Sequence, residues 1–288
     1  MKTLFQLGVA MLLCSSISAQ SVIHRISAGE DFYYYANELQ AALNDASPGD
    51  TILVPGHVYT FSPTIVTSVV LIGVGYDPES TTATGVSEIQ GNLTLNAPNT
   101  EVTGFKITGQ ITINAAATGS VIQRCKGESN VSFNSSANNI MITECIFANQ
   151  STSSAANSNI SISNADNVEI NNSLFESLTA SSGSTGLLLN NNVIFDGFSG
   201  VTGATFSCNV IDGGFATGSS GTLENDNIFN NNVVLDAGCT DACLTTDIGS
   251  DNVSNNTLFV TGTSVFGADL TDYPETGNDY LILDTSPA

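Results

Sequence analysis

The stretch Leu189-Asn190-Asn191-Asn192-Val193-Ile194 recurs along this chain in a recognisable form. In it, an apolar residue is followed by two spacers, an asparagine, one further residue and a second apolar residue. The same pattern returns around Asn209, Asn232 and Asn256. Towards the N-terminus the frame continues with other residues at the central position, namely Ser173, Cys145, Cys125 and Phe105. The repeat therefore organises more than half of the chain.

The spacing of the repeat indicates the fold. Successive central residues are separated by 20, 20, 28, 19, 17, 23 and 24 residues. Coils this short, built from runs of Val, Ile, Phe and Thr between Asn, Ser and Gly, leave no room for helices of ordinary length. A second column with alternating polarity recurs at Ile111-Thr112-Ile113, Val131-Ser132-Phe133 and Ile160-Ser161-Ile162. We therefore predict two strands per coil, turned at the asparagine, with parallel strands stacked about 4.8 Å apart between coils.

The repeated asparagine predicts a ladder of side-chain amides. An asparagine at one site of successive coils can adopt a left-handed turn conformation and hydrogen-bond to its neighbours above and below. Asn209, Asn232 and Asn256 are expected to be stacked and buried in this way. Cys125 and Cys145 fall in the same column, where we expect small buried residues.

The N-terminus has the features of a secretory signal peptide. Lys2 precedes an apolar run from Leu4 to Leu13, and small residues lead up to Ala19. We expect a signal peptide over residues 1–19, cleaved after Ala19. Leu13 is not the small residue that lipid attachment at Cys14 requires, so a lipid anchor is not expected. No later apolar run reaches the roughly 18 residues of a membrane span, so the mature chain is expected to be secreted or at the cell surface.

The charge balance narrows the choice of partners. Without residues 1–19, four cationic residues (5 − 1) face 27 acidic ones, a formal charge of −23. Nucleic acid and anionic membranes are poor partners for such a surface. A uronate polymer would also be repelled unless calcium or a local basic patch intervened.

Five cysteines remain in the expected mature chain, an odd number in a compartment that permits disulfides. Cys239 and Cys243 enclose three residues, and we predict a bridge between them. Directly stacked positions fit disulfide geometry poorly, so Cys125 and Cys145 are predicted to be unbridged. Cys208 has no evident partner.

Residues 20–50 are predicted to form an N-terminal cap segment, ahead of a β-helix over 51–288. Within Glu38–Gly49, apolar residues at 39, 42, 43 and 46 have helical spacing, and Pro48-Gly49 ends the pattern. A strand is expected over Thr51–Val54. The short helix would cover the open end of the core and block edge pairing. Tyr33, Tyr34 and Tyr35 suit either packing of this cap or a sugar-stacking shelf, and packing is favoured.

Three stretches carry a family resemblance: LQAALNDASPGDTILVPGHVY (39–59), VVLIGVGYD (69–77) and VTGFKITG (102–109). Together with the coils they resemble the secreted right-handed parallel β-helix proteins of the pectin-lyase-like superfamily, over roughly residues 22–288. The resemblance implies an all-β, right-handed parallel β-helix. It implies no single activity, because that superfamily includes lyases, hydrolases, esterases, tailspikes and non-catalytic surface proteins. The final segment, Tyr280–Ala288, resembles one that usually runs on, so the C-terminal cap is expected to be incomplete or the chain to be part of a longer product.

Lys106, Arg124 and Lys126 form the one concentrated group of cations, and we select them as candidate substrate-binding residues. Lys106 and Lys126 occupy the same offset in neighbouring coils. Lyases of the resembled superfamily use a Lys or Arg base and a second cation, or calcium, to neutralise a uronate carboxylate. The competing interpretation is structural, since Arg124 shares its offset with Glu144, and Glu128 follows Lys126 by two residues, so these cations can pair with acids on adjacent coils.

No catalytic residue or metal-ligand set is assigned. The paired-Asp and Asp-His motifs and the Arg-x-Pro-x-x-Arg feature of pectin-degrading enzymes are missing from the sequence. His24 and His57 are expected to be surface or packing residues away from carboxylate clusters. The acidic segment with Asp236, Asp241, Asp247 and Asp251 keeps calcium as a candidate ligand, although a solvated loop is favoured. Likewise, no regular threonine rank of the kind found on ice-binding faces is recognised, because only Thr112 and Ser132 are seen to stack.

These observations predict a secreted β-helix that binds an extracellular polysaccharide or cell-surface component, or serves as a surface or adhesive structure, without catalysis. The alternative is a polysaccharide lyase, or another carbohydrate-active enzyme, acting through Lys106, Arg124 and Lys126.

Overall fold

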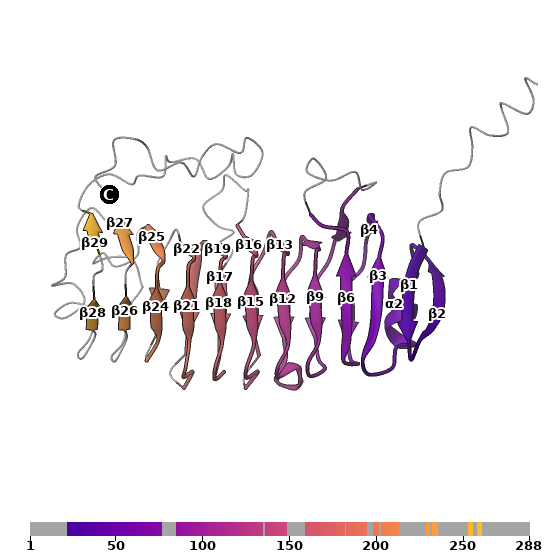
Figure 1. Cartoon of the computed structure of the whole chain (residues 1–288), viewed down its shortest axis with the longest axis horizontal. Helices are drawn as coiled ribbons and strands as arrows, with labels where there is room; N and C mark the ends of the chain where they lie inside the picture. The colour runs from indigo at the N-terminus through magenta and orange to yellow at the C-terminus, as the bar shows by residue number, and fades with distance from the viewer. Residues whose placement is uncertain are drawn as a thin grey trace, which may run out of the picture.

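Each complete coil of the chain folds into three short strands separated by corners, and the coils stack along one axis (Figure 1). This arrangement is a parallel β-solenoid, as the repeat predicts. The computed structural model describes residues 22–76, 85–134, 136–148, 159–181, 183–194, 198–201, 203–212, 228–230, 232–235, 253–255 and 258–260. Asn256, the insertion at 151–158, the Cys239–Cys243 loop and the acidic residues from Asp236 to Asp251 lie outside the described residues.

The strands form three sheets that run the length of the solenoid. Sheet A consists, in spatial order, of β2 (Glu30–Tyr35), β1 (Val22–Ser27), β3 (Asp50–Val54), β6 (Val69–Gly73), β9 (Glu101–Thr103), β12 (Val121–Gln123), β15 (Met141–Thr143), β18 (Glu169–Asn171), β21 (Leu188–Asn190), β24 (Thr205–Ser207), β26 (Ile228–Asn230) and β28 (Val253–Asn255). Sheet B consists of β4 (His57–Tyr59), β7 (Ser87–Ile89), β10 (Lys106–Ile107), β13 (Lys126–Gly127), β16 (Ile146–Phe147), β19 (Leu174–Phe175), β22 (Val193–Ile194), β25 (Val210–Asp212), β27 (Val233–Leu235) and β29 (Leu258–Val260). Sheet C consists of β5 (Thr64–Ile65), β8 (Leu93–Leu95), β11 (Ile111–Ile113), β14 (Val131–Phe133), β17 (Asn159–Ile162), β20 (Ser177–Ala180) and β23 (Phe198–Ser199).

The predicted number of strands per coil was therefore wrong, because the recurring six-residue pattern is itself two strands. Its first apolar residue lies in sheet A and its last lies in sheet B, with a corner between them. The residue just before the central position turns this corner with positive φ: Gly104 (76°), Arg124 (49°), Glu144 (54°), Asn172 (49°), Asn191 (56°) and Cys208 (57°). The left-handed conformation thus belongs to this residue and not, as predicted, to the ladder asparagine that follows it.

Inward-facing residues of equivalent strands stack into continuous apolar columns. In sheet A the column contains Val102, Ile122, Ile142, Ile170, Leu189 and Phe206, and each of these side chains is buried. Alternation of buried and outward residues is the consequence of the two-residue period of a strand. Because every coil buries its face against the next one, the core runs through the solenoid without interruption.

The asparagine ladder is confirmed for Asn192, Asn209 and Asn232, which are buried. The Oδ1 of Asn209 accepts hydrogen bonds from the backbone N–H of Asn192 at 2.9 Å and from its Nδ2 at 3.0 Å. The Nδ2 of Asn209 donates to the carbonyl of Leu189 in the same preceding coil at 3.0 Å. Asn232 makes the equivalent bonds to Asn209 and to the carbonyl of Phe206. Each amide therefore satisfies polar backbone groups of the previous coil inside the wall.

The ladder continues upstream with smaller side chains. The backbone N–H of Ser173 donates to Asn192 Oδ1, and the Oγ of Ser173 accepts from the backbone N–H of Cys145. Cys125 and Cys145 are buried and unbridged, which confirms the prediction for both. Burial, together with the neighbouring Cys125, raises the pKa of the Cys145 thiol well above its usual range, so Cys145 contributes packing rather than reactivity.

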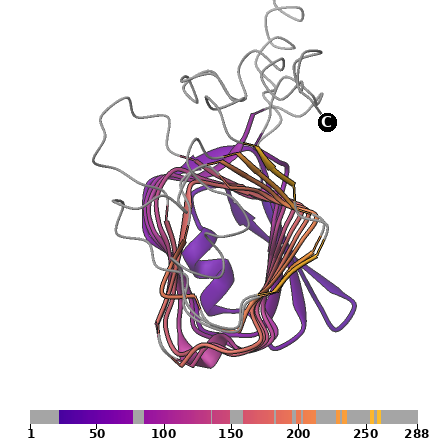
Figure 2. The same ribbon diagram turned by 90° about the vertical axis from the view of Figure 1, so that its left-hand side faces the viewer.

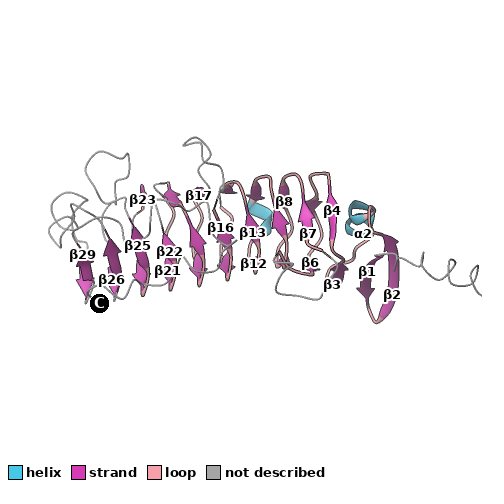
Figure 3. Ribbon diagram, turned by 90° about the horizontal axis from the view of Figure 1, so that it is seen from above, coloured by secondary structure: helices cyan, strands magenta, loops and turns pink. Residues whose placement is uncertain are grey.

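The N-terminal end is closed by a hairpin and the helix α2 (Leu39–Asn44). Leu39, Ala42 and Leu43 are buried against the first coils, so the predicted capping helix is confirmed. Viewed along the axis, α2 lies within the outline of the coils (Figure 2). It and the short 3-10 helix Ala115–Ala117 are the only helices in the described part of the chain (Figure 3).

The hairpin of β1 and β2 was not predicted, and a buried ion pair joins it to the first coil. Arg25 donates to Asp50 at 2.8 Å and to the hydroxyl of Tyr34 at 3.2 Å, and its guanidinium lies 4.1 Å from the centre of the Phe32 ring. Arg25 and Asp50 are almost fully buried. Asp50 also accepts from the backbone N–H of Ser47, so the charge of its carboxylate is compensated from several directions.

Candidate functional site

The predicted cationic group is assembled on one wall, but the charges of Lys106 and Arg124 are already compensated by glutamates. Lys106 and Lys126 are directly paired across β10 and β13, as their offsets predict. The Nζ of Lys106 lies 3.1 Å from a carboxylate oxygen of Glu128 and 3.7 Å from one of Glu88. Lys126 is only 9% exposed, so little of its side chain can reach a ligand.

Arg124 lies at the corner between sheets A and B and pairs with Glu144 of the next coil at 2.6 Å. Both side chains are exposed, so this pair is well solvated and contributes little to stability. The pairing favours the structural interpretation of these cations. Binding of a substrate by Lys106, Arg124 and Lys126 stays a prediction.

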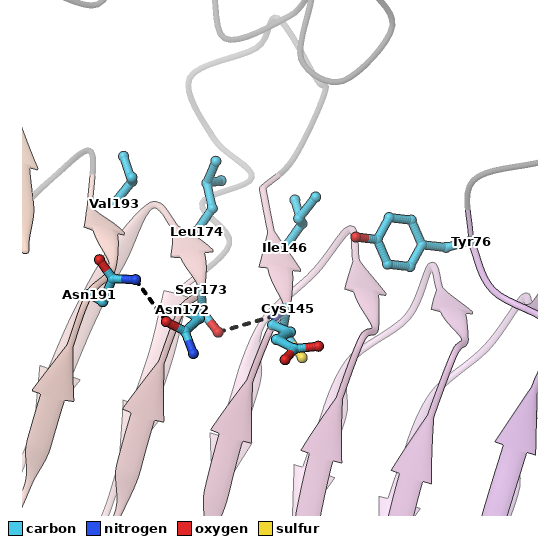
Figure 4. A pocket seen from close by; sticks show the side chains of 9 residues that line it. Tyr76, Cys145, Ile146, Asn172, Ser173, Leu174, Asn191 and Val193 are labelled. Atoms are coloured by element: carbon cyan, nitrogen blue, oxygen red, sulfur yellow. Dashed lines mark hydrogen bonds between the residues drawn. The ribbon is translucent and has the colours of Figure 1, made fainter. Parts of the chain in front are cut away.

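A shallow groove of about 410 Å³ opens on the same wall, along the strands β16, β19 and β22 (Figure 4). Its apolar side is formed by the outward residues of β16, β19 and β22, which are Ile146, Leu174 and Val193. Its polar side is formed by an amide pair in which Asn191 Nδ2 donates to Asn172 Oδ1 at 2.8 Å.

Three titratable side chains line this groove, and they belong to Tyr76, Glu144 and Cys145. Glu144 is engaged by Arg124, and the pKa of the Cys145 thiol is raised by its burial. General acid–base catalysis requires a group whose pKa lies near the working pH and within reach of the substrate. The buried Cys145 thiol does not meet this requirement.

Two tyrosines project from the capping hairpin. Tyr33 is 64% exposed and Tyr35 is 59% exposed, and their two-residue separation on β2 places them on the same face. The predicted packing role is therefore confirmed for Tyr34, which packs against the core. Tyr33 packs within the cap against His24 but is largely exposed, and the prediction is wrong for Tyr35, which is exposed as well. The tyrosine shelf, defined as Tyr33 and Tyr35, is an exposed aromatic surface on a rigid strand pair.

His24 supports this shelf as a packing residue, and it also contacts a single carboxylate. Its ring stacks on Tyr33 with 4.8 Å between ring centres, and its Nε2 lies 2.7 Å from Asp31 Oδ1. Paired residues of β1 and β2 bring these side chains together, since His24 faces Tyr33 across the hairpin. His57, by contrast, contacts Tyr59 edge-on and has a packing role, as expected.

Sheet C carries a second regular feature, which extends the stacking of Thr112 and Ser132 to further threonines and serines. The outward middle positions are in register from strand to strand, and they are Thr64, Thr94, Thr112, Ser132, Ser161 and Thr179, with Ser199 next in backbone register. Their spacings of 30, 18, 20, 29 and 18 residues are irregular, which hid the rank from the sequence. We call these six residues the hydroxyl rank.

Metal binding and membrane insertion find no support among the described residues. No group of three or more His, Cys, Asp and Glu side chains there is close enough to hold a metal ion. The acidic segment considered for calcium lies outside this part. None of the described helices has the length and apolar character needed to cross a bilayer.

A scan of the chain against protein-family models finds no match, and a search of curated proteins finds no similar sequence. The function therefore has to be inferred from the residues and geometry of the chain itself.

Proposed function

We propose that this protein is an exported, non-catalytic β-helix of the pectin-lyase-like kind that binds an uncharged extracellular carbohydrate. The observation that carries the proposal is the tyrosine shelf. Exposed aromatic rings on a rigid strand pair offer an apolar surface for the C–H face of a pyranose, while polar neighbours can bond its hydroxyls. Asp31 and His24 lie beside Tyr33 and supply such polar groups.

The acidic surface of the chain supports an uncharged ligand. The chain has 27 acidic and 5 cationic residues, so its surface repels polyanions. Among the described cations, Arg25 and Arg124 pair with Asp50 and Glu144, Lys106 lies between two glutamates, and Lys126 is nearly buried. No strong anion site remains in that part of the chain. The signal-peptide features at Lys2 and Leu4–Leu13 support export.

The test is a screen of the chain against neutral and acidic glycans, followed by affinity measurements with the double variant Tyr33→Ala/Tyr35→Ala. Binding to a neutral glycan is expected to weaken by at least about tenfold, because each aromatic contact contributes about 0.5–1.5 kcal/mol beyond the area it buries. Leu188→Ala on β21 is the matched control, since it also removes an exposed apolar side chain and should leave binding unchanged. Absence of neutral glycan binding, or equal binding by the double variant, would refute the proposal.

A further inference from the structure

The strand at the N-terminal end of sheet A has an unpaired edge. β2 pairs with β1 on one side, and no described strand lies beyond it (Figure 1). A free edge presents backbone N–H and C=O groups that can pair with a strand of another chain. Proline, lysine and bulges are common ways to block such an edge. The strand Glu30–Tyr35 contains no proline or lysine, and its register with β1 has no bulge.

The hairpin geometry shows which backbone groups point towards the open edge. Ser27 pairs with Glu30 across a two-residue turn with positive φ, and such a turn is closed by a hydrogen bond between these two residues. Hydrogen-bonded and non-hydrogen-bonded pairs alternate along an antiparallel hairpin. Asp31, Tyr33 and Tyr35 therefore direct their backbone N–H and C=O groups away from β1.

Glu38 closes one end of this edge. The backbone N–H of Tyr35 donates to Glu38 Oε2 at 2.9 Å, and the backbone N–H of Glu38 donates to the carbonyl of Tyr35 at 2.9 Å. Among the described residues, nothing bonds in this way to the outward N–H and C=O groups of Asp31 and Tyr33. The open edge therefore consists of the backbone groups of these two residues, placed symmetrically on either side of Phe32.

Phe32 shows that the inner face of the hairpin is also incompletely covered at this end. It is paired with Arg25, which is buried, and the guanidinium lies 4.1 Å from the centre of the Phe32 ring. Phe32 is nevertheless 36% exposed, because the described sheet has no strand beyond β2 to cover it. Apolar rings on the core side of a sheet are usually buried. The free backbone groups and the exposed ring thus have the same centre.

We propose that two copies of this protein pair through β2 about a two-fold axis at Phe32. Antiparallel pairing that sets Asp31 opposite the partner's Tyr33 uses all the free N–H and C=O groups of both edges. The two Phe32 rings then face each other as a non-hydrogen-bonded pair, in which side chains come closest, and they cover one another. Two-fold dimers are the commonest closed assemblies. This inference does not rest on carbohydrate binding.

The charges near the edge are compatible with this register. Asp31 faces the partner's Tyr33 and Glu30 faces the partner's Tyr34, so no two carboxylates are directly opposite each other. The Nε2 of His24 lies 2.7 Å from Asp31 Oδ1. Charges further away are screened over about 8 Å at physiological ionic strength, although the chain is strongly acidic. A second copy is favoured over a strand of another protein, because its free groups and its exposed ring match in number and position.

The test measures the mass of the purified protein by sedimentation over a concentration series. The mass is expected to rise from one chain to two, and added salt should lower the dissociation constant by screening the acidic surfaces. Asp31→Pro removes one outward N–H from each edge, where proline is tolerated, and should raise the dissociation constant at least about tenfold. Asp31→Ala is the matched control, since it removes the same carboxylate, keeps the N–H and should still dimerise.

Cross-linking tests the register without the proline variant. The background variant is Cys208→Ser, which removes an exposed native thiol. Phe32→Cys then sets two cysteines opposite each other with Cα atoms about 4.5 Å apart, and oxidised glutathione should join them in a disulfide. Glu30→Cys is the control on the same face of the strand. Its thiol would lie roughly 13 Å from its counterpart, so no cross-link is expected.

A wild-type chain that remains a monomer at every concentration overturns the proposal. So does an Asp31→Ala variant that dissociates as readily as Asp31→Pro, or a dimer in which Phe32→Cys forms no cross-link. Should the thermal midpoint show that Asp31→Pro does not fold, the cross-linking result decides. A monomer that binds an alternating threonine–lysine peptide, and loses this binding in Asp31→Pro, would assign the edge to a strand of another protein instead.

Discussion

Two adjacent residues have separate roles at the described corners between sheets A and B where an asparagine occupies the central position. The first adopts positive φ and turns the chain, as Asn191 does, and the second is buried and bonds to the preceding coil, as Asn192 does. Glycine is required at the first of these two positions where the backbone of the neighbouring coil lies too close for a Cβ atom. A Cβ on Gly104 would lie 2.7 Å from the carbonyl oxygen of Gly73, so even alanine would force the backbone to shift.

The ladder gives a prediction for a single residue. Asn209→Leu removes the acceptor for the backbone N–H of Asn192 and the donor to the carbonyl of Leu189. It also removes the side-chain donor to Asn232 Oδ1, which keeps only the backbone N–H of residue 209 as a donor. Buried polar groups left unsatisfied cost about 1–3 kcal/mol each, so the free energy of unfolding should fall by at least this amount. Urea denaturation of the variant and the wild type measures the difference.

Asn134→Leu is the control for this substitution. It removes an exposed amide that makes one hydrogen bond to Asn114, and we expect a change of less than about 0.5 kcal/mol. Equal stability of Asn209→Leu and the wild type would show that the ladder does not support the fold.

At the scale of elements, the sequence predicted those features that repeat or follow helical spacing. The coil, the ladder column and the helix α2 belong to this group. The hairpin of β1 and β2 was missed because its strands pair antiparallel with no counterpart in the coils. The third strand per coil was missed because the six-residue pattern runs through a corner with its apolar spacing unchanged. Only the positive φ at residues such as Glu144 shows that the pattern contains two strands.

The cap gives a prediction at this scale, through Asp50. Burial opposes ionisation of its carboxyl, but hydrogen bonds from Ser27, from the Ser47 backbone N–H and from Arg25 outweigh it, so the pKa of Asp50 lies below its ordinary value. Ionised Asp50 therefore stabilises the folded chain above about pH 4, and this contribution is lost as the pH falls through the folded pKa. Asp50→Asn leaves Arg25 buried without its counter-ion, which costs about 3–5 kcal/mol at neutral pH.

Measurement of unfolding in urea between pH 7 and pH 2 tests this account. The difference in unfolding free energy between the wild type and Asp50→Asn should shrink below about pH 4, as the wild-type carboxyl becomes protonated. Asp31→Asn removes a half-exposed carboxylate of the same hairpin, and it should cost less than about 0.5 kcal/mol at pH 7. A difference that stays constant down to pH 2 would contradict the role given to the ion pair.

For the whole molecule, candidate sites were harder to predict than the fold. Lys106, Arg124 and Lys126 were selected because cationic residues are rare in this sequence. The number of cations does not reveal their ion-pair partners, and in the structure glutamates on adjoining coils compensate Lys106 and Arg124. The hydroxyl rank and the tyrosine shelf became visible only with the register and burial of the strands. Surface function depends on which residues become neighbours across coils of unequal length, and the repeat period alone does not determine that.

The last prediction concerns catalysis by the whole molecule. Abstraction of a proton beside a uronate carboxylate needs a base and a compensating positive charge, both within hydrogen-bond reach of the substrate. Lys106 is held between Glu88 and Glu128, Lys126 is nearly buried, and the formal charge of −22 repels a polyanion. We therefore expect no unsaturated uronates from pectate, alginate or chondroitin, with or without calcium, when product absorbance is followed over time. Turnover of any of these polymers that disappears in Lys126→Ala would show that the wall of sheet B is a lyase site, provided that the variant keeps the thermal midpoint of the wild type.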